Sequence, residues 1–171
     1  MSIKSAITYA VKTMYFSFFC IFCTPFIVHA DTTELEVWAN EAIVATYTYN
    51  FQNFIARQRE IAKYFSSAGW IAYSAALNNA KLPEMVAKNS YFVNAVATLP
   101  PEIKTLNSNS WQATMPILVT YKNPQSQQKQ NLAITLKFSK ASSGVGVRGY
   151  QIDFLQSKVT APACECQQPV K

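Results

Sequence analysis

Histidine and paired acidic residues, which carry most acid–base chemistry in proteins, are scarce in this sequence. The only histidine, His29, ends the N-terminal segment, so a chain cleaved after that segment has none. Without histidine, Ser-His-Asp and Cys-His nucleophile arrangements and histidine-ligated metal sites are excluded. The nine carboxylates are scattered, and apart from Glu102 at the start of a short expected strand only Asp153 lies within a predicted strand, where alternation directs it away from Ile152 and Phe154. The sequence therefore predicts no catalytic residue, no bound metal and no enzyme activity.

Residues 144–149 read G-V-G-V-R-G and match the G-x-G-x-x-G fingerprint of dinucleotide-binding proteins. That fingerprint needs a helix directly after it and an acidic residue about twenty positions later. Here Tyr150 and Ile152 begin an alternating pattern typical of a strand, and Gln168 stands near the place of the acid. We therefore interpret the glycines as a turn or bulge before the last strand, and we expect no cofactor.

The four cysteines form two pairs with different expected roles. Cys20 and Cys23 lie in an apolar N-terminal run that offers no folded strand–helix context for redox chemistry, so we interpret them as apolar side chains. Cys164 and Cys166 lie near the C-terminus, and three interpretations stay open: a strained disulfide across one residue, a disulfide to another chain, or a metal site without histidine ligands. We name Cys164 and Cys166 as disulfide candidates.

Residues 1–30 are typical of a secretory signal peptide. They combine two lysines with an uncharged apolar run and end in Val28-His29-Ala30, a small-x-small pattern, so we predict cleavage between Ala30 and Asp31. A helical run of about fifteen residues reaches about 22 Å, short of the roughly 30 Å hydrocarbon core. The alternative is an uncleaved inner-membrane anchor. In either case we expect the body of the protein in the periplasm, with membrane contact only if the leader is retained.

The charge balance does not suggest a nucleic-acid partner. The formal charge of +6 includes two lysines of the leader, so the rest of the chain carries only +4. The densest basic group, Arg57, Arg59 and Lys63, is interpreted as a solvated helix face. The aromatic residues, which include Trp38 and Trp111, are expected mostly in the core, and those left outside would line a pocket or an interface.

Hydrophobic residues spaced by three and four positions predict helices in the first half of the body. A capping box at Thr33 and Glu36 is expected to begin the first helix, and Gly69 to end the second. Pro83 and Glu84 are typical of the first turn of a short fourth helix. The predicted segments are 33–49, 51–65, 70–79 and a short one from residue 82.

After Asn89, apolar residues alternate with polar ones, which predicts half-buried antiparallel strands. Helices followed by strands predict an α+β fold with N-terminal helices packed on an antiparallel sheet. We assign residues 31–158 to one periplasmic domain and 159–171 to a tail that contains proline and cysteine. The expected strands cover 91–97, 102–106, 111–121, 132–138 and 150–154, with a solvated glutamine-rich loop at 123–131.

Seven short motifs follow one another along the exported body, and their order and spacing are specific although no single motif is diagnostic. They are W-A-N-E-A-I-V at 38–44, I-A-K-Y-F at 61–65, G-W-I-A-Y-S at 69–74, N-A-V-A-T at 94–98, W-Q-A-T-M-P-I-L-V at 111–119, Y-K-N-P at 121–124 and G-V-R-G at 146–149. In these motifs, and in the terminal Cys-x-Cys, the chain resembles the periplasmic domain of the DotI/IcmL family of the Dot/Icm type IVB secretion system.

The resemblance implies a nuclear-transport-factor-like (cystatin-like) fold, with helices on a curved antiparallel sheet. It also implies a structural or assembly role in an envelope-spanning complex, with other secretion-system envelope proteins and weakly bound copies of the same chain as partners. The family has no catalytic residues to carry over. Members of the working apparatus have a cytoplasmic segment and an inner-membrane helix, whereas a cleavable leader precedes this domain, so a soluble periplasmic paralogue is one interpretation.

A second class of function stays open at this point. Folds of this type often hold a pocket between sheet and helices, so the alternative is a pocket that binds a small apolar ligand or has isomerase-like activity. Such an activity would need a carboxylate pointing into the pocket, and strand alternation directs Asp153 outward.

Overall fold

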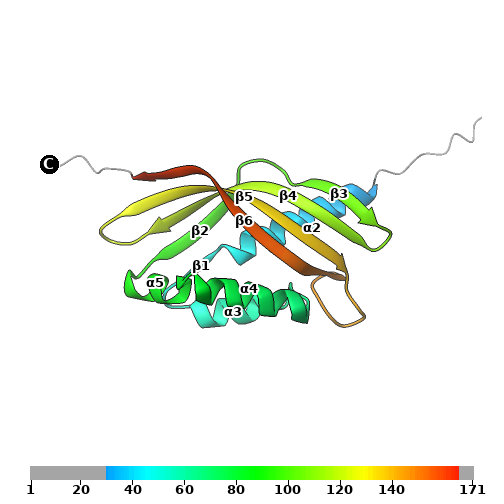
Figure 1. The fold of residues 1–171 in the computed structure, drawn as a ribbon, viewed down its shortest axis with the longest axis horizontal. Coiled ribbons are helices and arrows are strands. Elements are labelled where there is room, and N and C mark those ends of the chain that lie inside the picture. The colour runs from blue at the N-terminus through cyan, green and yellow to red at the C-terminus, as the bar shows by residue number, and fades with distance from the viewer. Residues whose placement is uncertain (1–29, 166–171) are drawn as a thin grey trace, which may run out of the picture. The chain divides into compact units, whose positions relative to one another are not determined.

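A curled antiparallel sheet and four helices make up residues 30–165, the part of the chain that this computed structural model describes (Figure 1). The strand order is β1-β2-β4-β5-β6, and β3 pairs with β4. The α+β fold predicted from the sequence is confirmed. In chain order the elements are α2 (Ala30–Thr46), β1 (Tyr49–Asn50), α3 (Phe54–Ala62), α4 (Ser67–Asn79), α5 (Leu82–Lys88), β2 (Phe92–Ala97), β3 (Glu102–Asn107), β4 (Ser110–Lys122), β5 (Gln127–Lys140) and β6 (Tyr150–Glu165).

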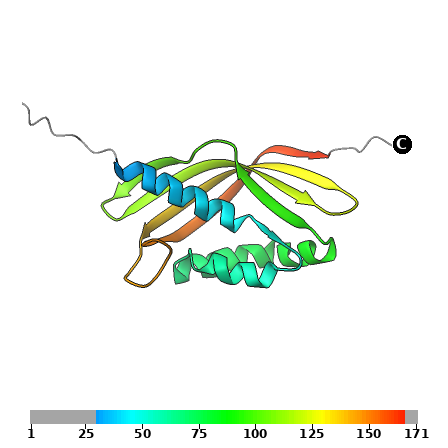
Figure 2. The ribbon, with the colours of Figure 1, turned by 180° about the vertical axis from the view of Figure 1, so that it is seen from behind.

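Helix α2 crosses one face of the sheet (Figure 2) and supplies one side of the core. Leu35, Trp38 and Ala42, predicted to share one helix face, are all buried. The opposing strands bury every second residue, as their period of two predicted, and Trp111 is only 8% exposed. Each buried aliphatic or aromatic side chain contributes about 1.5–3 kcal/mol by leaving water, so this layer holds α2 on the sheet. Besides Trp111, the buried residues of β4 and β5 are Ala113, Met115, Ile117, Val119, Leu132, Ile134, Leu136 and Phe138.

Both ends of the first helix were predicted wrongly: the expected range was 33–49, and the observed helix is Ala30–Thr46. Helix α2 begins at Ala30, so Thr33 lies inside the helix and the capping box does not form its start. The helix ends at Thr46, where the buried Thr46 hydroxyl donates to the carbonyl of Ala42 (2.7 Å). Tyr49 therefore belongs to the short strand β1.

Gly69 lies in the first turn of α4 and does not end a helix, which corrects the expectation. Ser66 is the N-cap of α4, and its hydroxyl accepts a hydrogen bond from the amide of Gly69 (3.2 Å). A Cβ at position 69 would collide with the carbonyl oxygen of Ile152 in β6. Glycine is needed here because the start of α4 touches the backbone of the last strand.

Strands β2 and β3 occupy two halves of the same edge of β4. β2 pairs with Ile117–Lys122 and β3 with Ser110–Thr114. Between them, the amide of Thr98 donates to the carbonyl of Pro116 (3.0 Å), and Pro100 and Pro101 have no amide hydrogen to continue the ladder. The chain consequently leaves the sheet for four residues, 98–101, next to α2.

The loop in the glutamine-rich segment is shorter than the predicted range of 123–131. β5 begins at Gln127, so residues 127–131 belong to a strand and only residues 123–126 turn. The side-chain oxygen of Asn123 accepts from the amides of Gln125 (3.0 Å) and Ser126 (2.7 Å), which closes the turn.

Strand β6 contains a bulge that strict alternation could not predict. Phe138 pairs with Ile152, but Lys137 pairs with Phe154, so Asp153 is the extra residue. As a result Phe154, expected in the core, is 43% exposed, and Leu155 packs against the core in its place. The strand continues to Glu165, so the segment assigned to a tail from residue 159 starts within β6.

Candidate functional site

The glycine motif forms the turn predicted for it. Residues 141–149 connect β5 to β6, and Gly144, Gly146 and Gly149 have positive φ angles of 79°, 73° and 79°. These angles are readily available to glycine and strained for other residues. The motif is followed by strand β6 and lacks the helix N-terminus that a pyrophosphate would need.

The same loop is fastened to the first helix. The indole Nε1 of Trp38 donates to the carbonyl of Val147 (2.8 Å), and Arg148 forms an ion pair with Glu41. Glu41 also accepts a hydrogen bond from the hydroxyl of Tyr64 (2.7 Å). These polar groups hold three elements together, and a half-exposed ion pair contributes only about 0–1 kcal/mol, so the loop is a structural junction.

The three basic residues predicted to form a solvated helix face, Arg57, Arg59 and Lys63, do so only in part. Arg59 and Lys63 are exposed, as expected, but Arg57 is half-buried. Its Nε donates to the carbonyl of Thr48 (3.2 Å) and its Nη2 to that of Ala45 (3.3 Å). Arg57 therefore ties α3 to two carbonyls at and just beyond the C-terminal end of α2, a role that sequence spacing did not reveal.

The residues named as candidate sites lie at the limits of the described chain. Cys164 pairs through its backbone with Lys129 at the far end of β6, and Ala30 is the first residue of α2, followed by Asp31. Cys166 and residues 1–29 lie outside the described residues. The disulfide at Cys164 or Cys166 and the cleavage between Ala30 and Asp31 stay predictions.

Buried tyrosines lie between the helices and the sheet. Burial raises the pKa of Tyr47 to about 12, although a hydrogen bond with Ser157 acts in the opposite direction. Burial also raises the pKa of Tyr49, Tyr73 and Tyr121. These hydroxyls stay protonated at neutral pH and act as hydrogen-bonding groups of the interior. The acid expected to mark a catalytic pocket, Asp153, is exposed on the bulge of β6.

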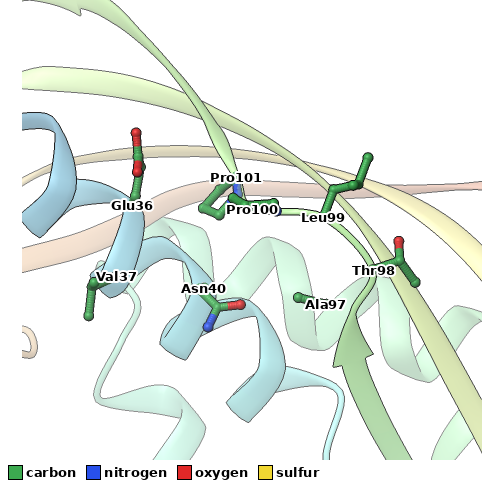
Figure 3. Close-up of a pocket in the computed structure, with 8 residues that line it drawn as sticks. All are labelled: Glu36, Val37, Asn40, Ala97, Thr98, Leu99, Pro100 and Pro101. Atoms are coloured by element: carbon green, nitrogen blue, oxygen red, sulfur yellow. The ribbon is translucent and has the colours of Figure 1, made fainter.

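A groove of about 400 Å³ lies between α2 and the loop that joins β2 to β3 (Figure 3). Glu36, Val37 and Asn40 line it from the helix, and residues 97–101 line it from the sheet side. Val37 and Leu99 are 51% and 63% exposed, which is high for apolar side chains. The side-chain oxygen of Asn40 is buried without a hydrogen-bond partner.

The groove offers apolar contact, the amide of Asn40 and the hydroxyl of Thr98, with a single acid, Glu36, at its wall. That set lacks the paired groups that proton transfer or nucleophilic attack requires. Sequence reasoning missed the groove, because only the loop residues Leu99-Pro100-Pro101 carry a signal and the helix side is separated from them by about sixty positions. The signal that could have found it is an exposed leucine before two prolines.

Residues 30–165 contain neither a cluster of metal-ligating side chains nor a membrane-spanning helix. Among residues 30–165, no group of three histidine, cysteine, aspartate or glutamate side chains lies close enough together to hold a metal ion. No helix in the same range combines the length and the apolar character needed to span a bilayer.

The family model that matches this chain covers residues 27–158 and describes the DotI/IcmL inner-membrane complex component of type IVb secretion systems. No curated protein matches the sequence. The matched range includes every helix and strand described above except the end of β6.

Solved structures agree with this match. An IcmL-like type IV secretion system protein from Legionella pneumophila subsp. pneumophila str. Philadelphia 1 is 61% identical, with a TM-score of 0.76 over 80% of this chain and 98% of its own. The periplasmic domain of DotI is 31% identical, with a TM-score of 0.68 over 74% of this chain and 94% of its own.

A more distant structure extends the likeness at the level of fold alone. CagV, a VirB8 homologue from Helicobacter pylori strain 26695, is 12% identical, with a TM-score of 0.61 over 75% of this chain and 99% of its own. The predicted helices on a curved antiparallel sheet are thus confirmed. On the family match and these identities, the chain belongs to the DotI/IcmL family of type IVB secretion-system components.

Proposed function

We propose that this protein is a non-enzymatic assembly component that works in the periplasm by binding other envelope proteins of a type IVB secretion system, and more weakly by binding copies of itself. The observation that carries the proposal is the 31% identity to the periplasmic domain of DotI, spread over nearly all of that domain. In this proposal two copies bind each other only weakly. Weak pairwise binding is sufficient because many such contacts act together in a multi-copy assembly and raise the effective concentration of each partner.

The polar groups of the structure support a binding role. Arg57, Glu41 and Trp38 are occupied in joining elements, and the buried tyrosine hydroxyls hold their protons at neutral pH. Exposed apolar side chains, such as Val37 and Leu99 at the groove, provide contact area on the surface. Exposed apolar side chains that gather on one surface are typical of protein interfaces.

Affinity purification from the native envelope tests the proposal. The full chain with a C-terminal tag is isolated from gently solubilised envelopes, and co-purifying proteins are identified by mass spectrometry. We expect other secretion-system components to be enriched over a strain that carries the untagged protein. Enrichment of none of them, together with turnover of a small substrate by the isolated protein, would replace the assembly role with the pocket-bearing alternative.

The compartment has its own test. Cell fractionation followed by N-terminal sequencing is expected to find a periplasmic chain that begins at Asp31, because residues 1–30 combine a short apolar run with Val28-His29-Ala30. A chain that retains Met1 in the inner membrane would favour the anchored alternative, and a cytoplasmic chain would contradict both.

A further inference from the structure

The outer edge of β6 is unpaired after its first residues. One edge of β6 pairs with β5 along the strand. The other edge is bonded at Ile152, whose amide donates to the carbonyl of Tyr64 (2.7 Å) and whose carbonyl accepts from the amide of Ser66 (2.9 Å). Beyond Ile152, no other element within residues 30–165 forms a backbone hydrogen bond with this edge. The helices thus cover the start of the edge and leave its continuation open.

The direction of the unpaired groups follows from the ladder. In an antiparallel pair, successive residues point their amide and carbonyl groups alternately toward and away from the neighbouring strand. Ile152 faces away from β5 and is paired with Phe138, so the residues paired with Leu136, Ile134 and Leu132 face away too. In β6 these residues are Leu155, Ser157 and Val159.

This stretch lacks most of the features that protect sheet edges. Residues 156–160 are all exposed, and apolar Phe154 and Val159 are 43% and 51% exposed. Within β6 no proline occurs before Pro162, and Lys158 is the only charged residue between the bulge and that proline. Natural sheets usually block such an edge with prolines, several charges or a covering element, because it is a template for another strand.

We propose that residues 154–160 of β6 pair antiparallel with the same residues of a second copy, about a two-fold axis at Ser157. The inference rests on the self-association in the proposed function and names the surface that forms it. Two-fold symmetry requires the edge to be complementary to itself. With Ser157 opposite Ser157 of the second copy, Leu155 lies opposite its Val159 on one face. On the other face Gln156 lies opposite its Lys158.

The two neighbouring registers place less compatible side chains opposite each other. An axis at Lys158 would place two ammonium groups directly opposite each other, which is destabilising. An axis at Gln156 would place apolar Leu155 opposite the hydroxyl of Ser157 and Val159 opposite the carboxylate of Asp153. The Ser157 register places half-buried Leu155 of each copy against exposed Val159 of the other, and it forms about six backbone hydrogen bonds, two for each outward-facing residue pair.

The substitution Ser157→Pro is expected to disturb pairing at the outer edge of β6 without disturbing the pairing of β6 with β5. The Ser157 amide faces away from β5, so proline at this position removes a hydrogen-bond donor only from the outer edge. Ser157→Ala is the matched control, because it keeps the amide and loses only the hydroxyl that bonds to Tyr47. Sedimentation analysis of the purified full-length protein over a concentration series is expected to show a monomer–dimer equilibrium that S157P weakens at least tenfold and S157A leaves unchanged.

Cross-linking tests the register. In a full-length variant with all four cysteines replaced by serine, S157C is expected to form an intermolecular disulfide on mild oxidation, because directly opposite residues lie about 5.5 Å apart at Cα. S108C, in the exposed turn between β3 and β4, is the control and should cross-link far less.

Three results would overturn the proposal: a wild-type protein that is strictly monomeric at high concentration, S157P dimers as strong as wild type with native circular dichroism, or equal cross-linking of S157C and S108C. A fourth result would also overturn it: S157P no longer captures an envelope protein that the wild type captures, while its self-association is unchanged. That result would mean that a strand of the captured protein pairs with this edge. Capture of envelope components by a monomer would leave the proposed function standing while the paired edge falls, so the two failures are distinguishable.

Discussion

Trp38 shows how single residues connect distant parts of this chain. Its ring lies 4.9 Å from that of Phe138 and 5.6 Å from that of Tyr150, measured between centroids, and its indole nitrogen bonds to Val147. Helical spacing was enough to predict that Trp38 is buried. Its polar partner could not be predicted, because a backbone carbonyl carries no sequence signal and lies 109 positions away.

Trp111→Ala is expected to destabilise the protein by about 3–5 kcal/mol, because it removes a buried aromatic and leaves a cavity. Trp111 stacks on Phe138 with a centroid distance of 5.5 Å and meets Tyr150 edge-on at 5.7 Å. Denaturant unfolding of the variant and the wild type measures the difference. A loss below about 1 kcal/mol would show that this tryptophan contributes little to packing.

Gly146→Ala and Gly144→Ala form a matched pair in the β5–β6 loop. Both glycines have similar positive φ angles, so either substitution costs about 1–2 kcal/mol of backbone strain. Only at Gly146 does an added Cβ also collide, with the carbonyl oxygen of Tyr150 and with Ala141, whereas the space around Gly144 is open. Chemical denaturation is expected to rank G146A as clearly less stable than G144A. Equal losses would show that the loop relaxes freely.

At the scale of elements, regular patterns were predictable and interruptions were not. The alternation of β4 and β5 located their buried faces, because a half-buried strand imposes a period of two on its residues. The bulge at Asp153 escaped prediction, since one inserted residue leaves no compositional mark and reverses the inward and outward sides of everything after it. Gly69 was misread for a related reason: its role depends on the backbone of β6, which no local window contains.

Because of the bulge, Leu155 is expected to contribute more to stability than Phe154, the reverse of what strict alternation predicts. Leu155→Ala should destabilise the fold by about 1–3 kcal/mol, because Leu155 packs against the core although it is only partly buried. Phe154→Ala should cost less than about 1 kcal/mol, since Phe154 is 43% exposed and its ring centroid lies 5.6 Å from the ammonium of Lys137. Urea unfolding of both variants decides, and a greater loss for F154A would contradict the register of β6.

The groove belongs to the same scale, because it exists only where two elements meet. Two prolines interrupt the edge of β4, the chain steps away from the sheet, and α2 passes beside it. Each part has a local explanation in the sequence, but their meeting depends on the tertiary arrangement. The site was therefore less predictable than the fold.

For the whole molecule, the buried tyrosines predict loss of stability at alkaline pH. An unfolded tyrosine ionises near pH 10, whereas burial raises the pKa of Tyr47 in the folded protein to about 12. Between these values the folded state binds more protons than the unfolded state, so the free energy of unfolding falls as pH rises, by up to about 1.4 kcal/mol per pH unit for each such tyrosine.

Unfolding midpoints measured from pH 8 to 11.5 should be nearly flat below pH 9.5 and fall steeply above pH 10. Tyr47→Phe is the control, because it removes one ionisable group and should make the fall shallower. A wild-type midpoint that stays constant through pH 11 would show that the folded tyrosines ionise as readily as exposed ones.

The attachment of α2 to the last hairpin also bears on the order of events during synthesis. A chain that emerges with its N-terminus first makes α2 early, but Phe138, Val147 and Tyr150, which surround Trp38, come about a hundred residues after Trp38. The apolar face of α2 is not fully covered until β5 and β6 are complete, and contacts so far apart in sequence form slowly. The domain therefore cannot complete its core until almost all of the chain has been made, and a chain without a completed core is the form that can pass through a narrow translocation channel.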